Sequence, residues 1–339
     1  MKQIDIKDFF ETKHSLEIIG QIDKQAKQFS NKKRNYFNNR TKNTIYKQTF
    51  KGLLIEEIHK FILQKYNFLY FCDIFADNSR HNSDMFDLMT VNGQTIDIKS
   101  WSPRGTNAST KNLDYEWTKK RRVDYYAVFN LPTFHQVKTF HFLELKHTLK
   151  TIDFYGFIPF KSFENQLSYY PETGFVKPKA IGKHQNYFYV LPDKAPTTAK
   201  NVVNDNFDDY LNLFEPKTPF YPKQSKIKLK INKNERLSCI TVTTKRTTQK
   251  IKERWNKLHY QRLGDIHFVY QLAGDKVTNY QDNKYFNWQS FTTILLKTVL
   301  RNTNKQVVVH LPKSLQHKKQ FNRIYELTKY MNIWFIFDK

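Results

Sequence analysis

Residues 83–101 carry charged side chains whose spacing could support chemistry. Two stretches able to form strands flank the pair Asn92-Gly93, and this dipeptide is the strongest short-range signal for a tight hairpin turn. Side chains alternate between faces along a strand, so Asp97 and Lys99 should point to the same side. The hairpin would fold Asp87 back toward them. The two strands are predicted over residues 86–91 and 94–101.

Two carboxylates beside one lysine can hold a divalent metal ion and steady an attacking hydroxide. Asp87 and Asp97 are therefore the predicted ligands of one or two Mg²⁺ ions, which would neutralise charge on a scissile phosphate. Lys99 is expected to hold or deprotonate the attacking water and to offset charge in the transition state. Glu56, from the preceding helix, is expected to contact the metal through water or to position Lys99. These residues predict a metal-dependent phosphodiester-cleaving site.

The elements that would position these side chains can be read from the hydrophobic pattern. Apolar residues at helical spacing predict a helix over 49–66 that carries Glu56, with Glu57 as a competitor for the same role. The combined pattern indicates a mixed sheet of three or four strands with flanking helices, preceded by a helical extension. Further strands are predicted at residues 68–75, 123–130, 137–145, 155–160 and 187–191, a helix at residues 113–122, and a loop at residues 30–46.

The charge balance points to a polyanionic partner. The 339 residues carry a formal net charge of +25, an excess that costs self-repulsion and favours nucleic acid as the partner, although coding bias in an AT-rich genome is an alternative explanation. The run Lys119, Lys120, Arg121 and Arg122 is a candidate for following phosphates.

Several other classes are disfavoured by what the sequence contains. Its two cysteines, Cys72 and Cys239, lie far apart, which argues against a disulfide framework or a cysteine-based zinc site and suggests a reducing compartment. The histidines show no zinc-hydrolase spacing, and no glycine-rich phosphate loop ends in Gly-Lys-Ser/Thr. No run approaches the roughly 18 apolar residues of a membrane span. We therefore expect a cytoplasmic protein with no membrane association.

A proline-containing polar stretch suggests two domains. We predict a first domain over residues 1–200, a linker over 201–225 and a basic α/β domain over 226–339 that serves target recognition or regulation. In this last part strands are predicted at 237–243, 266–272, 306–311 and 333–337, and helices at 248–258, 288–300 and 316–330. The succession suggests parallel strands. Residues 241–248 could bind an anion at a helix N-terminus, although a basic surface loop is the simpler description.

The ordered set of motifs resembles the PD-(D/E)XK nuclease superfamily, also called restriction-endonuclease-like. The matching pieces are the helix 50–57, Phe86-Asp87-Leu88, Ile96-Asp97-Ile98-Lys99 and the strand 123–129, over roughly residues 50–130. The proline of the family name is missing, and Asp84 is an alternative to Asp87 as the first acid. The resemblance implies an α/β/α core with a mixed central sheet and Mg²⁺-dependent hydrolysis of nucleic acid. It does not extend to residues 200–339.

Together these features predict a Mg²⁺-dependent endonuclease that hydrolyses DNA, of a restriction or antiviral-defence type, with Mn²⁺ able to substitute. Cutting both strands of a duplex normally needs two active sites, so a homodimer is expected. One alternative is an effector nuclease activated by a phosphorylated ligand near Lys245 and Arg246. Another is a nucleic-acid-binding module of the same fold whose acids are structural.

Overall fold

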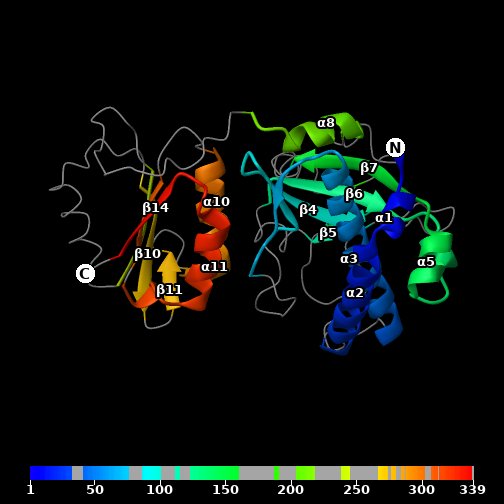
Figure 1. Ribbon diagram of the computed structural model, residues 1–339, viewed down its shortest axis with the longest axis horizontal. Coiled ribbons are helices and arrows are strands. Elements are labelled where there is room, and N and C mark those ends of the chain that lie inside the picture. The colour runs from blue at the N-terminus through cyan, green and yellow to red at the C-terminus, as the bar shows by residue number, and fades with distance from the viewer. Residues whose placement is uncertain are drawn as a thin grey trace. The chain divides into compact units, whose positions relative to one another are not determined.

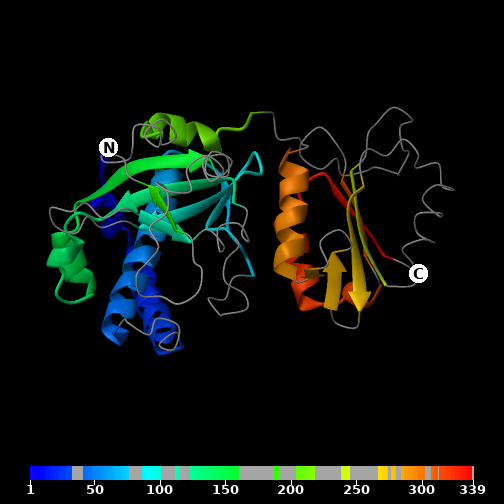
Figure 2. The same cartoon turned by 180° about the vertical axis from the view of Figure 1, so that it is seen from behind.

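The chain divides into two compact units, each of which combines helices with a six-stranded sheet (Figures 1 and 2). The first holds Met1–Cys72, Asp77–Thr90 and Gln94–Glu215, and the second holds Asp73–Ala76, Val91–Gly93 and Pro216–Lys339. No helix in the described part of the chain is long and apolar enough to cross a membrane. The computed structural model describes residues 1–32, 41–75, 86–100, 111–114, 123–159, 187–190, 204–217, 238–244, 266–273, 276–279, 284–286, 288–301, 307–311 and 313–337.

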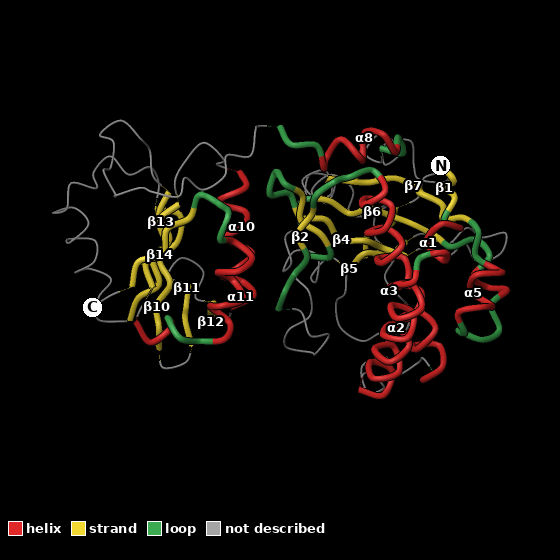
Figure 3. The backbone as a smooth tube through the Cα atoms, viewed as in Figure 1, coloured by secondary structure: helices red, strands yellow, loops and turns green. Residues whose placement is uncertain are grey.

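The sheet of the first unit is mixed, as the sequence predicts, but it has six strands instead of the predicted three or four. Figure 3 draws the strands in yellow. Its strand order is β1-β7-β6-β4-β3-β2. Strand β4 runs parallel to β6, whereas the other neighbouring strands pair in antiparallel fashion. The strands are β1 (Lys2–Asp5), β2 (Tyr70–Phe71), β3 (Leu88–Thr90), β4 (Thr95–Ser100), β6 (Tyr125–Asn130) and β7 (Thr151–Pro159).

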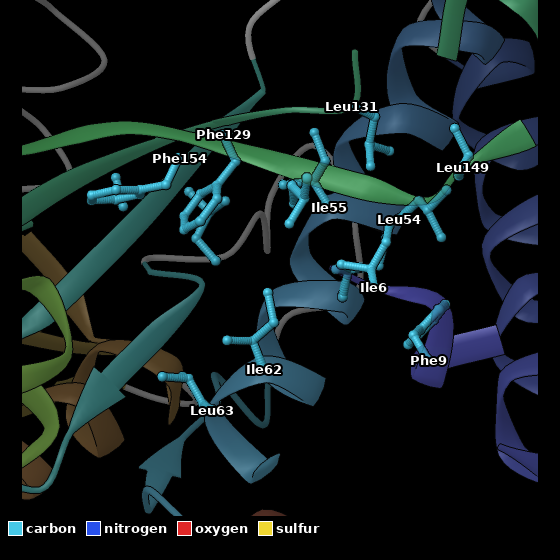
Figure 4. Close-up of a cluster of buried hydrophobic side chains, with 14 of the residues drawn as sticks. Ile6, Phe9, Leu54, Ile55, Ile62, Leu63, Phe129, Leu131, Leu149 and Phe154 are labelled. Atoms are coloured by element: carbon cyan, nitrogen blue, oxygen red, sulfur yellow. The ribbon is translucent and has the colours of Figure 1, made fainter. Parts of the chain in front are cut away.

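Helices pack on one face of this sheet and form its main core. Helix α1 (Lys7–Glu11) leads into α2 (Lys13–Lys32), which lies alongside α3 (Lys42–Lys65; Figures 1 and 2). The apolar side chains of α3 recur every three or four residues, which places them on one side of the helix. Figure 4 shows some of them with their partners from the sheet: Leu54, Ile55, Ile62, Phe129 and Phe154.

Helix α3 begins several residues earlier than the pattern predicts. Its N-cap is Thr41, whose side-chain oxygen accepts a hydrogen bond from the Thr44 amide at 3.1 Å. The first turns carry polar residues and so give little hydrophobic signal, but a threonine cap supplies the acceptor that a helix start needs. The predicted loop over 30–46 is therefore helical at both of its ends, in α2 and in α3.

The predicted hairpin is present, and its turn is longer than expected. Strands β3 and β4 pair with Leu88 opposite Ile96, and the Thr90 amide donates to the Gln94 carbonyl at 2.8 Å. Three residues therefore form the loop, with Gly93 in the left-handed region at φ 71°. In three-residue hairpin loops the residue in that region is the favoured place for glycine.

Two predicted elements differ in type. The stretch 137–145, predicted as a strand, contains the start of helix α5 (Phe142–Thr148), and Leu145 is the buried residue of that helix. The Glu144 carboxylate accepts hydrogen bonds from the amides of Lys138 and Thr139, which ties the preceding loop to the first turn. The first two residues of the predicted helix 113–122 belong instead to strand β5 (Lys111–Asp114). This strand pairs with β8 (Tyr187–Val190). Residues 115–122 lie outside the described part of the chain.

Part of the predicted linker belongs to the first unit. Helix α8 (Phe207–Leu211) and the short turn η2 (Asn212–Phe214) fall inside the stretch 201–225. The side chain of Asn206 caps α8 by accepting from the Asp208 and Asp209 amides. Apolar residues spaced three and four apart then enter the core: Phe207, Tyr210, Leu211 and Phe214. Residues 218–225 lie outside the described part.

The second unit contains four parallel strands with two antiparallel strands at one edge. Its strand order is β12-β11-β10-β9-β13-β14, and β10, β9, β13 and β14 are parallel. The four parallel strands lie within two residues of the predicted ones, whereas the predicted helix 248–258 is outside the described residues. The elements are β9 (Ser238–Thr244), β10 (Ile266–Ala273), β11 (Lys276–Asn279), β12 (Lys284–Phe286), α10 (Trp288–Arg301), β13 (Val307–Leu311), the turn η4 (Lys313–Leu315), α11 (Lys319–Thr328) and β14 (Ile333–Phe337).

In the first unit, the start of β4 is fastened to the start of β6 by one side-chain pair. The Asp124 carboxylate accepts from both the amide and the hydroxyl of Thr95, each at 2.8 Å. The Asp124 amide in turn donates to the Thr95 carbonyl at 2.9 Å. We call this pair of residues, Thr95 and Asp124, the clip. After it, β4 and β6 pair in parallel, with Asp97 opposite Tyr126.

We expect Asp124→Ala to lower the free energy of unfolding by about 1–3 kcal/mol, because it leaves the buried Thr95 donors without their acceptor. Urea titration of the full chain, with a probe that reports the first unit, measures the change. Glu17→Ala is the matched control, since Glu17 is exposed and pairs only with His14 at 3.4 Å among the described residues. It should change stability by less than about 0.5 kcal/mol. An equal effect of both variants would contradict the role of the clip.

Candidate active site

Asp87 is bound to strand β4 on both sides of Asp97. The Asp87 amide donates to the Ile96 carbonyl at 3.0 Å, and its carboxylate accepts from the Ile98 amide at 2.5 Å. Strand β3 starts at the next residue, so the carboxylate takes a donor that would otherwise continue the ladder. Asp87 is 8% exposed. The hairpin therefore places the first predicted acid next to the second.

Asp97 and Lys99 form a close ion pair on one face of β4. The Lys99 ammonium lies 2.5 Å from each carboxylate oxygen of Asp97. Asp97 is 2% exposed, whereas the side chain of Lys99 is 24% exposed. Burying an unpaired carboxylate costs several kcal/mol, and the ammonium offsets part of that cost. The two residues separated by one position point to the same side, as the strand pattern predicts.

The chain contains the same tetrapeptide twice, and the two copies differ in environment. Ile-Asp-Ile-Lys occurs at residues 4–7 as well as at 96–99. In the first copy Asp5 and Lys7 are 3.1 Å apart, with side chains 60% and 59% exposed. In the second copy the aspartate is buried and lies beside Asp87. The tetrapeptide alone therefore does not define a site, and the buried hairpin around it does.

Helix α3 carries both candidate glutamates, and their positions differ. At about 100° per residue, Glu56 lies about 100° from the buried Ile55 on one side of the buried face, and Glu57 lies about 100° from the buried Ile58 on the other side. The Glu57 carboxylate pairs with the Lys60 ammonium at 2.6 Å. Burial lowers the pKa of Lys60, but the negative charges of Glu57 and, more weakly, Glu56 outweigh burial and raise it. The two glutamates thus flank the buried face of α3 from opposite sides, and Glu57 has Lys60 as a partner.

The hairpin gathers three of the four predicted catalytic residues: Lys99 contacts Asp97 directly, and Asp87 binds the peptide groups on either side of Asp97. Asp87, Asp97 and Lys99 meet at the hairpin, whereas Glu56 is placed on the helix α3 that packs against β4. The alternative first acid, Asp84, lies outside the described residues. The predicted phosphate-binding residues Lys119, Lys120, Arg121 and Arg122 do as well.

The donor set of the hairpin suits Mg²⁺ in one particular way. Proteins hold Mg²⁺ with one or two carboxylates, while water and substrate phosphates complete the shell. Asp87 and Asp97 supply such a pair. Within the described ranges no group of three or more His, Cys, Asp or Glu side chains is arranged to hold a metal ion. The remaining ligands of an ion at this hairpin would therefore be water and phosphate oxygens. Asp97 would give up its contact with Lys99 to bind the ion.

A buried polar pair near the site is not evident from the sequence. The Tyr210 hydroxyl lies 2.9 Å from Nε2 of His59, and both residues are fully buried. Burial, followed by the nearby charge of Lys60, lowers the pKa of His59 to about 3. Burial and then the charge of Asp87 raise the pKa of Tyr210 well above its usual value. The signal for Tyr210 was its place in the apolar spacing of residues 207–214, after a capping asparagine.

The low pKa of His59 makes stability depend on pH. The folded chain keeps His59 neutral, whereas the unfolded chain binds a proton near pH 6.5. Between about pH 6.5 and pH 3 the unfolded state holds more protons. The free energy of unfolding should therefore fall with decreasing pH by up to about 1.4 kcal/mol per pH unit from this group.

His59→Leu should remove this contribution and flatten the fall in stability between pH 6.5 and pH 4. Denaturant titrations at several pH values measure the slope. His14→Leu is the control, because His14 is exposed on α2. A His59→Leu slope equal to that of the parent chain would show that His59 is not a buried neutral group.

Comparisons of the chain with protein-family models, with curated proteins and with solved structures found no match. The interpretation of the site therefore rests on its own geometry. That geometry consists of two adjoining buried carboxylates, one of them bound by a partly exposed lysine, at the open end of a hairpin.

Proposed function

We propose that the protein is a Mg²⁺-dependent endonuclease that hydrolyses DNA phosphodiester bonds, with a site of the PD-(D/E)XK type. The observation that carries the proposal is the binding of Asp87 to the two peptide groups that flank Asp97, with Lys99 on Asp97. The arrangement of the motif-bearing elements supports it. Helix α3 packs against β4, and β3, β4 and β6 are neighbours in one mixed sheet.

Each residue has a role that follows from its chemistry. Asp87 and Asp97 would hold Mg²⁺, which when bound supplies charge neutralisation and lowers the pKa of bound water. Lys99 orients the attacking water and offsets the negative charge that develops on the phosphate. Its partial exposure lets the ammonium face the substrate while its stem remains on β4. Glu56 positions Lys99 or a water from the side of α3.

The charge of the chain supports a nucleic-acid substrate. With a net charge of +25, long-range attraction would concentrate polyanions around the protein. We assign duplex DNA as the substrate, a homodimer as the cutting form, and restriction or antiviral defence in the cytoplasm as the context. The second unit would recognise the target or regulate cleavage.

The proposal predicts that Asp97→Asn and Lys99→Met each lower Mg²⁺-dependent cleavage by at least about 100-fold, because each removes a group that acts at the reacting phosphate. Supercoiled and linear plasmid DNA, incubated with and without Mg²⁺ or Mn²⁺, serve as substrates, and gel analysis measures the rate. The matched controls are Asp5→Asn and Lys7→Met, which make the same changes in the exposed copy of the tetrapeptide. Both controls should cut like the parent.

Three outcomes would point elsewhere. Asp97→Asn protein that cuts as fast as the parent would refute the assignment of the site. A parent chain that binds DNA but leaves it intact with either metal would be a nucleic-acid-binding module. Cleavage that appears only after addition of a small phosphorylated ligand would identify an effector nuclease.

A further inference from the structure

The pair Tyr210–His59 lies where polar groups are costly. His59 packs its ring against Phe129 at 5.1 Å and near Phe214 at 6.1 Å. Tyr210 packs against Phe154 at 5.1 Å and Phe157 at 5.5 Å. Apolar side chains of similar size could fill this space without any need for a hydrogen bond.

The hydrogen bond has one favoured polarity. If the Tyr210 hydroxyl donates to Nε2 of His59, the proton of the neutral ring is on Nδ1, which has no hydrogen-bond partner in the described part of the chain. The reverse direction would leave both Nδ1 and the hydroxyl proton without a partner. Tyrosine is therefore the donor. One buried nitrogen remains unsatisfied, at a cost of about 1–3 kcal/mol.

The pair joins the helix of Glu56 to helix α8, which packs on the sheet of the candidate site. His59 is one helical turn after Glu56 on α3. Tyr210 comes from α8, more than a hundred positions later in the chain, and its ring packs against Phe129 of β6, the strand that pairs with β4. One end of the hydrogen bond thus belongs to the helix of Glu56, and the other end is packed on strands β6 and β7 of the sheet that contains β4.

Directional bonding here has a consequence that apolar packing lacks. Apolar contacts tolerate small sliding of a helix over a sheet, whereas a buried hydrogen bond is satisfied at one register. Catalytic geometry is sensitive on that scale, since a shift of about 1 Å can cost about 100-fold in rate.

We propose that the Tyr210–His59 hydrogen bond is a positioning device for the candidate active site, which fixes helix α3 and Glu56 relative to the sheet that carries Asp97. The inference rests on the proposed function and names two residues that act through others rather than on the substrate. It also gives a role to the capped helix α8, which lies near the end of the last segment of the first unit.

The test compares Tyr210→Phe with the all-apolar pair Tyr210→Phe/His59→Leu in the full chain. Tyr210→Phe keeps the ring and deletes the hydroxyl. We expect its maximal cleavage rate to fall about ten-fold and its half-saturating Mg²⁺ concentration to rise about five-fold, in line with a small displacement of the site. The all-apolar pair should melt no lower than Tyr210→Phe, because no buried nitrogen is left unsatisfied, yet its rate should stay low.

Tyr46→Phe is the matched control. Tyr46 is also on α3, and its hydroxyl donates to Asp23 at 2.5 Å, on the side of α2. This variant should keep the parent's rate and Mg²⁺ dependence. A parent-like rate in Tyr210→Phe or in the all-apolar pair would overturn the inference, and so would an equal loss in Tyr46→Phe.

Titration with Mn²⁺, followed by the relaxation of water protons, separates this inference from the proposed function. If the parent binds Mn²⁺ and cuts no DNA, the proposed function fails, and weaker Mn²⁺ binding by Tyr210→Phe still supports the positioning role. Equal binding by Tyr210→Phe and the parent overturns that role. A parent chain that binds no Mn²⁺ overturns both.

Discussion

The hydrogen bond from the Ile98 amide to the Asp87 carboxylate is the contact on which the candidate site depends. It forms where the β3–β4 ladder ends, so it uses a side chain in place of a backbone acceptor. Together with the bond from the Asp87 amide to the Ile96 carbonyl, it holds Asp87 on the peptide groups that flank Asp97. On the other side of β4 the clip between Thr95 and Asp124 sets the register with β6. Strand β4 is thus held in register by both of its neighbours, β3 and β6.

Helix α3 completes the frame through a small number of directional bonds within an apolar interface. Lys51 donates to the Asn130 side chain at 2.7 Å, and His59 accepts from Tyr210 at 2.9 Å. Hydrophobic burial supplies most of the favourable free energy but does not specify a unique alignment. Buried polar groups cost desolvation and are satisfied at one alignment. The two bonds lie on either side of Glu56 along α3, and on the proposed positioning role they fix its place.

Local patterns identified the elements whose own residues determine their structure. The hairpin, strand β6 and helix α10 were predictable because alternation, a turn dipeptide or an apolar stripe is contained within each. Helix α5 was not, since its aromatic residues imitate a strand and its first turn is fixed by Glu144 binding the preceding loop. Helix α8 was missed because surrounding prolines suggested a linker. Its contacts with residues some 150 positions earlier were invisible in the sequence.

The site illustrates the same limit at the level of chemistry. The sequence contains Ile-Asp-Ile-Lys twice, and no local rule separates the exposed copy from the buried one. What distinguishes the buried copy is its partner strand in the hairpin, β3, which brings Asp87 to the peptide groups around Asp97. The tetrapeptide alone therefore does not predict whether its aspartate is buried.

The contrast between the whole chain and its site bears on the proposed mechanism. A net charge of +25 attracts DNA at long range, but two adjoining buried carboxylates repel a phosphate at short range. On the proposed function, the ammonium of Lys99 balances Asp97 while no divalent ion is bound. An ion held by the two aspartates would take over that role and release the ammonium toward water and phosphate. Metal binding and substrate binding would then favour each other. The ion would remove the repulsion between the carboxylates and the phosphate, and the phosphate would attract the ammonium away from the ion.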